Sequence, residues 1–230
     1  LFEKIKSETK SGYITALREI LPALEGTHAR YEHIDKLPRI YPAVEYCRSK
    51  DGERQMKHYN GLVQLDINKL SGQYEVELVK QQAALLPQTF AAFCGASGRS
   101  VKIWVRFALP EDEGLPVEEK KAVLFHAHAY RLAVRCYQPV LPFDITLKEP
   151  ALTQNCRMTL DECPYYNPDA VPFCLLQPLS MPDEGTFRQQ KQDEKNPLAR
   201  MTPGYQTADT FKMIYEAALG RAFREMENWK

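Results

Sequence analysis

Alternating apolar and polar side chains predict two β-strands in this chain. The alternation runs through residues 61–70 (GLVQLDINKL) and residues 101–107 (VKIWVRF). Because successive side chains of a strand point to opposite faces, each strand has one apolar face and one face with other chemistry. The second faces carry Gln64, Asp66 and Asn68 in the first strand and Lys102, Trp104 and Arg106 in the other. A shorter alternation over residues 141–147 (LPFDITL) predicts a third strand, with Asp144 pointing away from Phe143 and Ile145.

Apolar residues at helical spacing predict amphipathic helices between these strands. They occupy residues 13–24, 74–86 and 117–138, and a further one begins at Thr207. Residues 36–46 contain two prolines, which favours an edge strand there. Helices beside strands with clean alternation predict an α+β fold. Helices would cover one face of an antiparallel or mixed sheet and leave the polar face open.

The composition along the chain predicts one folded domain over residues 1–178. Residues 180–205 are polar and poor in large apolar side chains, so we expect a linker or mobile loop over residues 179–205. Residues 206–230 are expected to form a C-terminal amphipathic helix.

Composition and charge exclude several classes of protein. Of the 230 residues, 44% are hydrophobic and 26% are charged, as in ordinary globular proteins, and no apolar run is long enough for a membrane span. The 30 basic and 30 acidic residues cancel, so any nucleic-acid binding must come from a local basic patch. Six cysteines without a CxxC pair favour free thiols in a reducing, cytoplasmic compartment over a zinc site or a thiol enzyme.

Asp66 and Asn68 stand two residues apart and therefore side by side on one strand face. Asp144 has a similar place on its own predicted strand. Carboxylates gathered on one face suit Mg²⁺ or Mn²⁺, which prefer oxygen ligands. The alternative is that these are polar strand residues that simply meet water.

The turn formed by Ser97, Gly98, Arg99 and Ser100 is followed by Lys102. A small turn with exposed backbone N–H groups and nearby cations suits phosphate oxygens, although such a turn can also be no more than a turn. Trp104 and Arg106 extend a cation–aromatic stripe along the same face, as in proteins that hold single strands. Alternatively, Trp104 lies buried under a helix.

The order of these motifs resembles the archaeo-eukaryotic primase, or primase-polymerase, superfamily. The particular likeness is to the virulence-associated E type N-terminal domains of mobile-element and phage-like replication proteins, and it covers roughly residues 10–175. The segments that carry it are Leu65–Asp66–Ile67–Asn68, Ser97–Gly98–Arg99–Ser100–Val101–Lys102, Phe143–Asp144 and, more loosely, Cys156–Arg157 with Asp161 and Tyr166–Asn167–Pro168.

The resemblance implies a DNA primase or polymerase with an RNA-recognition-like sheet as its catalytic platform. Such a nucleotidyltransferase adds nucleotides on a single-stranded DNA template or primer-template during replication of a mobile element or phage, and a helicase domain is an expected partner. It implies that Asp66, Asn68 and Asp144 hold Mg²⁺ or Mn²⁺ and are catalytic. The triphosphate would be held by Ser97, Gly98, Arg99, Ser100, Lys102 and Arg157, and the nucleic acid by Trp104 and Arg106.

Two departures from the family pattern keep other functions open. Asn68 stands where the family has a second acid, and an amide is a weaker metal ligand than a carboxylate. Lys102 replaces the histidine common in the superfamily, although a lysine is familiar in the mobile-element branch. The alternatives are a catalytically weak nucleic-acid-binding module attached to a helicase, and a non-enzymatic protein-interaction domain.

Overall fold

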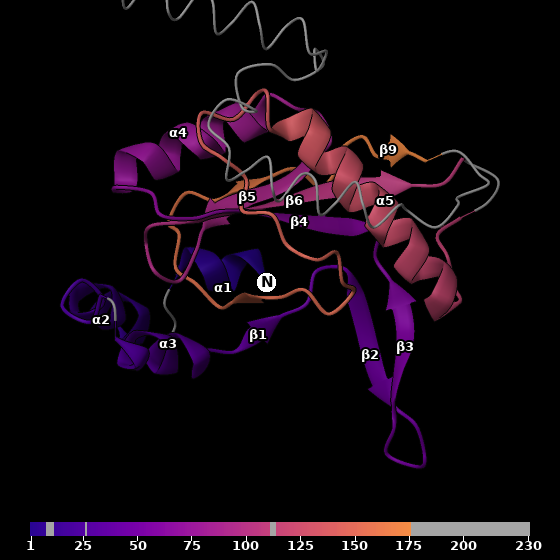
Figure 1. The fold of residues 1–230 in the computed structure, drawn as a ribbon, viewed down its shortest axis with the longest axis horizontal. Coiled ribbons are helices and arrows are strands. Elements are labelled where there is room, and N and C mark those ends of the chain that lie inside the picture. The colour runs from indigo at the N-terminus through magenta and orange to yellow at the C-terminus, as the bar shows by residue number, and fades with distance from the viewer. Residues whose placement is uncertain (8–11, 26, 111–113, 176–230) are drawn as a thin grey trace, which may run out of the picture. The chain divides into compact units, whose positions relative to one another are not determined.

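The computed structural model describes residues 1–7, 12–25, 27–110 and 114–175. In this part of the chain, the central sheet has the strand order β4 (Leu62–Ile67), β6 (Val101–Ala108), β5 (Thr89–Cys94) and β8 (Tyr165–Tyr166). These neighbours pair antiparallel, and the short strand β9 (Phe173–Cys174) pairs parallel to the far end of β6 (Figure 1). The architecture is therefore α+β with a mainly antiparallel sheet, as the sequence predicts.

Two helices cover one face of this sheet. They are α4 (Gln73–Ala84) and α5 (Glu119–Tyr137), which lie together above β4, β5 and β6 in Figure 1. The side chains of Val63, Leu65 and Ile67 are completely buried beneath them, as the strand alternation predicts. Each helix contributes an apolar stripe to the same layer, so this face is the main hydrophobic core.

The other face of the sheet is covered as well, which corrects the expectation of an open polar face. Helix α1 (Phe2–Lys6) lies there (Figure 1), and its Ile5 packs into a buried cluster with Phe93, Trp104 and Cys156. Gln64, on the same face, is only 1% exposed. Strand periodicity reveals which face is polar but not which later segments fold over it.

Smaller elements surround the sheet. Helix α2 (Tyr13–Ile20) and helix α3 (His28–Asp35) precede strand β1 (Arg39–Ile40), which pairs with β7 (Cys156–Arg157). Strands β2 (Val44–Arg48) and β3 (Arg54–Tyr59) form a separate antiparallel hairpin. No described helix is both long and apolar enough to cross a bilayer.

Most of the strongly periodic elements are confirmed. The helices predicted over residues 13–24, 74–86 and 117–138 correspond to α2, α4 and α5, and the two alternating segments correspond to β4 and β6. The predicted edge strand over residues 36–46 is divided into β1 and β2. The linker over residues 179–205 and the C-terminal helix over residues 206–230 lie outside the described residues.

The strand predicted over residues 141–147 is wrong, because this segment has no regular secondary structure. It runs beside β4 through one backbone hydrogen bond, from the Thr146 N–H to the Asp66 carbonyl at 2.7 Å. The next backbone donors turn to side chains instead: Ile145 N–H donates to Gln138 and Lys148 N–H to Tyr130. Alternation alone cannot reveal that side chains of the long helix over residues 119–137 and of Gln138 directly after it take the place of a strand ladder.

Trp104 is buried, so the exposed cation–aromatic stripe expected on β6 does not exist in this arrangement. Its side chain is 2% exposed, and its ring meets Phe93 edge-on at a centroid distance of 5.0 Å. The indole N–H donates to Gln64 Oε1 at 3.1 Å. A buried indole with a satisfied N–H is a core residue.

Replacing Trp104 with alanine should therefore lower the free energy of unfolding by about 3–5 kcal/mol, because a large buried side chain leaves a cavity. Chemical denaturation of the two proteins measures this difference. Unchanged stability together with weaker binding of single-stranded DNA would instead favour a base-stacking role for Trp104.

Candidate functional site

Asp66, near the end of β4, accepts contacts from two lysines. Lys102, its cross-strand partner on β6, places Nζ 2.7 Å from Oδ1, and Lys148 contacts Oδ2 from the segment that follows α5. Gln64 and Gln154 add amide donors at 3.1 and 3.5 Å. The Asp66 side chain itself has no exposed surface. Both carboxylate oxygens are thus surrounded by donors.

The charges in this cluster explain how Asp66 can be buried. Burial raises the pKa of the Asp66 carboxyl, but the ammonium groups of Lys102 and Lys148 outweigh that effect, and the pKa is lowered below its ordinary value. Asp66 is consequently ionised at neutral pH. One carboxylate and two ammonium groups leave the cluster with a net positive charge of about one.

The predicted metal site does not form in this arrangement. Lysine ammonium groups occupy the positions on Asp66 that a cation would take, and the Asn68 amide donates to Thr146 Oγ1 at 3.0 Å. Asp144 is exposed and lies outside any strand. Among the described residues, no group of three or more His, Cys, Asp or Glu side chains could hold a metal ion. The residues therefore do not fit Mg²⁺ or Mn²⁺ as placed.

The turn between β5 and β6 lies close to this cluster and has a defined shape. The Gly95 N–H donates to the Ser100 carbonyl at 2.8 Å, and the Gly98 N–H donates to the Gly95 carbonyl at 3.0 Å. Gly98 has a φ of +73°, where other residues are strained. A side chain at Gly95 would place its Cβ 2.2 Å from Ser100 Oγ, so the Ser100 hydroxyl would have to move.

These internal bonds use part of the backbone that the turn was expected to offer to phosphate. The N–H groups of Gly95 and Gly98 are committed as described, and the Arg99 N–H donates to Ser97 Oγ at 3.3 Å. A backbone nest needs N–H groups that converge on empty space. These three N–H groups are therefore not available to a phosphate, and the exposed Arg99 side chain is the cation that the turn itself can offer.

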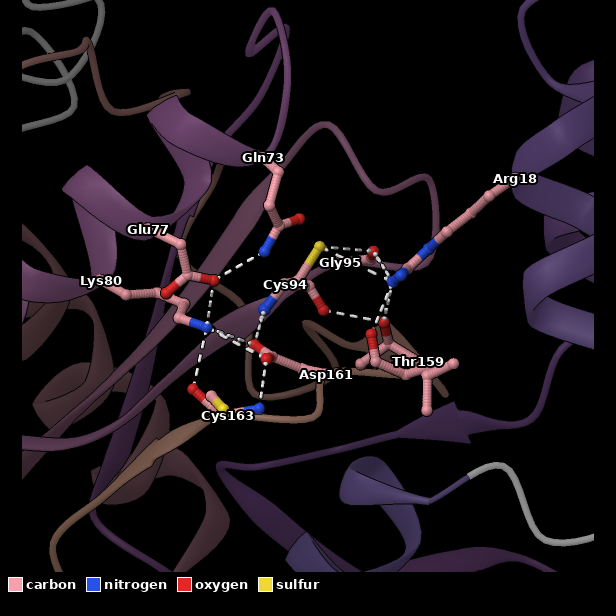
Figure 2. A network of polar contacts seen from close by, with 10 residues as sticks. Arg18, Gln73, Glu77, Lys80, Cys94, Gly95, Thr159, Asp161 and Cys163 are labelled. Atoms are coloured by element: carbon pink, nitrogen blue, oxygen red, sulfur yellow. Dashed lines mark hydrogen bonds and ion pairs between the residues drawn. The ribbon is translucent and has the colours of Figure 1, made fainter.

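Arg18 of α2 holds the turn in place, as Figure 2 shows. Its guanidinium donates to the Gly95 carbonyl at 3.1 Å, a contact drawn in Figure 2. The same group donates to the Ala96 carbonyl at 3.2 Å. It also reaches Thr159 Oγ1 at 3.2 Å and the Leu160 carbonyl at 2.6 Å. One side chain thus ties together α2, the turn and the segment after β7.

Asp161 provides a second anchor for the end of β5 (Figure 2). It is 6% exposed and accepts the Cys94 N–H at 2.7 Å and the Cys163 N–H at 3.0 Å. Lys80 of α4 contacts both of its carboxylate oxygens at 3.0 Å and Glu77 at 2.9 Å. Burial lowers the pKa of Lys80, but these two carboxylates outweigh it and raise that pKa. This network links α4, the end of β5 and the segment after β7, so it positions the turn.

A cavity of about 250 Å³ opens on the outer side of the turn. Arg99 contributes to its wall, with a side chain that is 41% exposed. Its Nε donates to the Leu70 carbonyl at 2.9 Å, and its Nη1 lies 3.7 Å from Glu25. The other lining residues come from α2, the start of α4 and the turn: Arg18, Leu21, Pro22, Gln73, Ser97 and Gly98. The Arg18 guanidinium is bonded to backbone carbonyls, so the more exposed Arg99 is the cation in this cavity that can meet an anion.

Two of the predicted phosphate or nucleic-acid contacts are engaged elsewhere. Arg157 donates to the carbonyls of Asp35 and Leu37 and forms an ion pair with the Asp35 carboxylate. Arg106 donates to the carbonyls of Pro168 and Ala170 at 3.2 and 3.3 Å. Both arginines therefore fasten loops to the sheet in this arrangement.

The sequence brought attention to Asp66, Lys102 and the turn but missed Lys148 and Arg18. Lys148 follows Asp144 and Thr146 at even spacing, a signal that could have placed it on the same side of its segment. Arg18 lies on an amphipathic helix far from the motifs in sequence, and nothing local marks it. Its role depends on tertiary contacts alone.

The Asp66 cluster predicts strong coupling between Asp66 and Lys102. Asp66→Asn leaves two ammonium groups around a neutral amide and should cost about 3–5 kcal/mol of stability. Lys102→Met should cost less in that background than in the native chain, with a coupling of at least about 1 kcal/mol in a double-mutant cycle by denaturation.

The exposed pair Lys121–Glu118 supplies the control cycle, with an expected coupling below about 1 kcal/mol. The pKa of Asp66 in the folded state lies below the usual 3.8. The contribution of its ionised form to the free energy of unfolding is therefore complete above the usual pKa and is lost as the pH falls through the lowered one. Coupling at Asp66–Lys102 no larger than the control would contradict the cluster.

Comparison with known proteins identifies the family of the chain. A model of the BT4734-like, N-terminal domain matches residues 32–166, more than half of the chain. The matched range includes Asp66, the turn, Lys148 and Asp161, whereas α1 and Arg18 precede it. Searches of curated proteins and of solved structures give no match. The chain belongs to the BT4734-like N-terminal domain family.

Proposed function

We propose that this domain is a primase-polymerase-like module that binds the polyphosphate of a nucleotide through cationic side chains. The observation that carries the proposal is the convergence of Lys102 and Lys148 on Asp66 beside the Ser97–Ser100 turn. This cluster keeps a net positive charge, and Arg99 and Arg18 line the neighbouring cavity. The proposal thus favours the second of the functions considered from the sequence, a catalytically weak nucleic-acid-binding module.

Exposure decides which cations can reach a ligand. The side chains of Lys148 and Arg99 are 39% and 41% exposed, whereas Lys102 is 14% exposed. Lysine approaches phosphate as a mobile point charge, and arginine grips it in a bidentate manner. Lys148 and Arg99 are therefore the proposed direct contacts, and Lys102 keeps Asp66 ionised behind them.

The primase-polymerase ancestry is supported by the arrangement of the motifs. The strand with Asp66 pairs directly with the strand that carries Lys102, Asn68 follows that first strand by one residue, and the segment with Asp144 runs beside it. The same resemblance supports a helicase domain as the partner of this module and single-stranded DNA as its polymer ligand.

The proposal predicts nucleotide binding that does not require a divalent ion. Calorimetry with ATP and with dATP should give similar affinities in EDTA and in Mn²⁺. Arg99→Gln and Lys148→Gln should each weaken binding by about 10-fold or more, because each removes a charge-assisted contact.

Lys121→Gln is the matched control, since it removes an equally positive side chain from the exposed surface of α5. It should leave the affinity nearly unchanged. Equal losses of nucleotide affinity in all three variants would mean that binding depends only on the overall positive charge. A complete lack of nucleotide binding in the native chain would favour a protein-interaction domain.

Template-directed nucleotidyl transfer is the second candidate. It is favoured by Asp66 near the end of β4 and Asn68 directly after that strand, with the Asn68 amide bonded to Thr146 in the segment that carries Asp144. Primer extension with Mn²⁺ tests it, with Asn68→Asp included because that change adds a charged oxygen ligand. Primer extension by the native chain or by Asn68→Asp would mean that a cation displaces the lysines from Asp66. That result would replace the proposal of metal-independent binding.

A further inference from the structure

The β2–β3 hairpin is a second feature with chemistry for nucleic acid, separate from the turn and its cavity. It extends away from the central sheet (Figure 1) and, among the described residues, pairs with no other strand. Its buried residues, Val44 and Tyr59, are paired at its base. The side chains between them and the tip are exposed or half-buried. A two-stranded hairpin of this kind gains little stability from its own contacts.

The base of the hairpin is firmly attached to the domain. Tyr59, the last residue of β3, is 1% exposed and packs edge-on against Phe125 of α5. Its hydroxyl lies 3.1 Å from Nδ1 of the buried His126. The hairpin is therefore anchored at one end and presents its other end to solvent.

Two arginines face each other across the outer end of the hairpin. Arg48 and Arg54 are directly opposite in the strand register, and both are exposed. Like charges at such a position repel, which is costly without an anion between them. In the described part of the chain, neither guanidinium forms an ion pair with a carboxylate. The pair is thus a ready position for a phosphate.

An aromatic platform adjoins this arginine pair. The Arg54 guanidinium lies 3.5 Å above the centre of the Tyr46 ring and 5.3 Å from that of Tyr41. Tyr46, Arg48 and Arg54 share one strand face and line a hollow of about 450 Å³ together with Cys47 and Gly52. The hollow falls in the size range of small-ligand sites. Planar groups beside unpaired cations are what single-stranded nucleic acid requires for base stacking and phosphate contact.

We infer that the β2–β3 hairpin binds single-stranded nucleic acid on its Tyr46–Arg48–Arg54 face. The arginine pair holds a backbone phosphate, and the Arg54–Tyr46 stack supports an adjacent base. The choice of nucleic acid as the partner rests on the proposed nucleotide-binding function and deepens it. The hairpin contacts themselves do not involve Arg99 or Lys148. The domain then has two ligand surfaces, one for a triphosphate and one for a strand.

The test is fluorescence anisotropy of the full chain with a labelled oligothymidylate of about 12 nucleotides. Arg48→Gln combined with Arg54→Gln should weaken binding at least about 10-fold and reduce the salt slope by about one to two. Arg54→Lys should lose part of the affinity, because lysine keeps the charge but not the planar stack.

Lys57→Gln is the matched control within the same hairpin. Lys57 is exposed, forms an ion pair with Glu45 at 2.7 Å and lies away from the Tyr46–Arg48–Arg54 face. It should change strand affinity less than about 3-fold, since it alters only the general charge. Thermal melting of every variant checks that the hairpin substitutions leave the domain folded.

Separate outcomes distinguish this inference from the proposed function. The double arginine variant should bind ATP as the native chain does, and Arg99→Gln should retain hairpin-dependent strand binding. Strand binding without ATP binding would overturn the proposed function and leave the hairpin site standing. Equal losses from Lys57→Gln and the arginine changes, tighter binding to polyglutamate than to the oligonucleotide, or no strand binding would overturn the inference.

Discussion

The structure of the site depends on how a fully buried carboxylate is compensated. An ionised Asp66 inside the protein would be prohibitively costly alone, and each of its neighbours reduces that cost. Lys102 arrives from β6, Lys148 from the segment after α5, and Gln64 relays a hydrogen bond that begins at Trp104. The Asp66 carboxylate thus joins the central sheet, the segment after α5 and the buried cluster around Trp104. The same arrangement removes Asp66 from the role of a ready metal ligand.

The position of the turn depends on a second set of largely buried charged groups. Asp161 holds the end of β5 through backbone N–H groups while Lys80 neutralises it, and Arg18 joins the turn to α2. These contacts use the Cys94 N–H as a donor and the Gly95 carbonyl as an acceptor, and we assign ligand binding beside the turn to exposed side chains. The hairpin has the opposite character: its base is buried, and its arginines lack carboxylate partners among the described residues. Lys80 and Lys102, which are largely buried, have carboxylate partners, and this separates them from the two hairpin arginines.

Much of the fold could be predicted from periodicity, because β4, β6, α4 and α5 each bury one regular face. The short elements could not, since β7 and β8 have two residues each and form through tertiary contacts. Only part of the site could be predicted from the sequence. Asp66, Lys102 and the turn lie in local motifs, but Lys148 and Arg18 reach the site from distant segments. The burial of Trp104 was open from sequence, because the covering residue Ile5 belongs to a helix with no periodic signal.

The central claim is that lysines, and not a metal ion, satisfy Asp66. A crystal structure of the chain grown with ATP and Mn²⁺, with anomalous scattering recorded for manganese, tests it most directly. The account predicts that Lys102 and Lys148 remain on the Asp66 carboxylate or turn toward phosphate oxygens, with no manganese peak on Asp66. A manganese ion bonded to Asp66, with Asn68 or Asp144 as a further ligand, would contradict it.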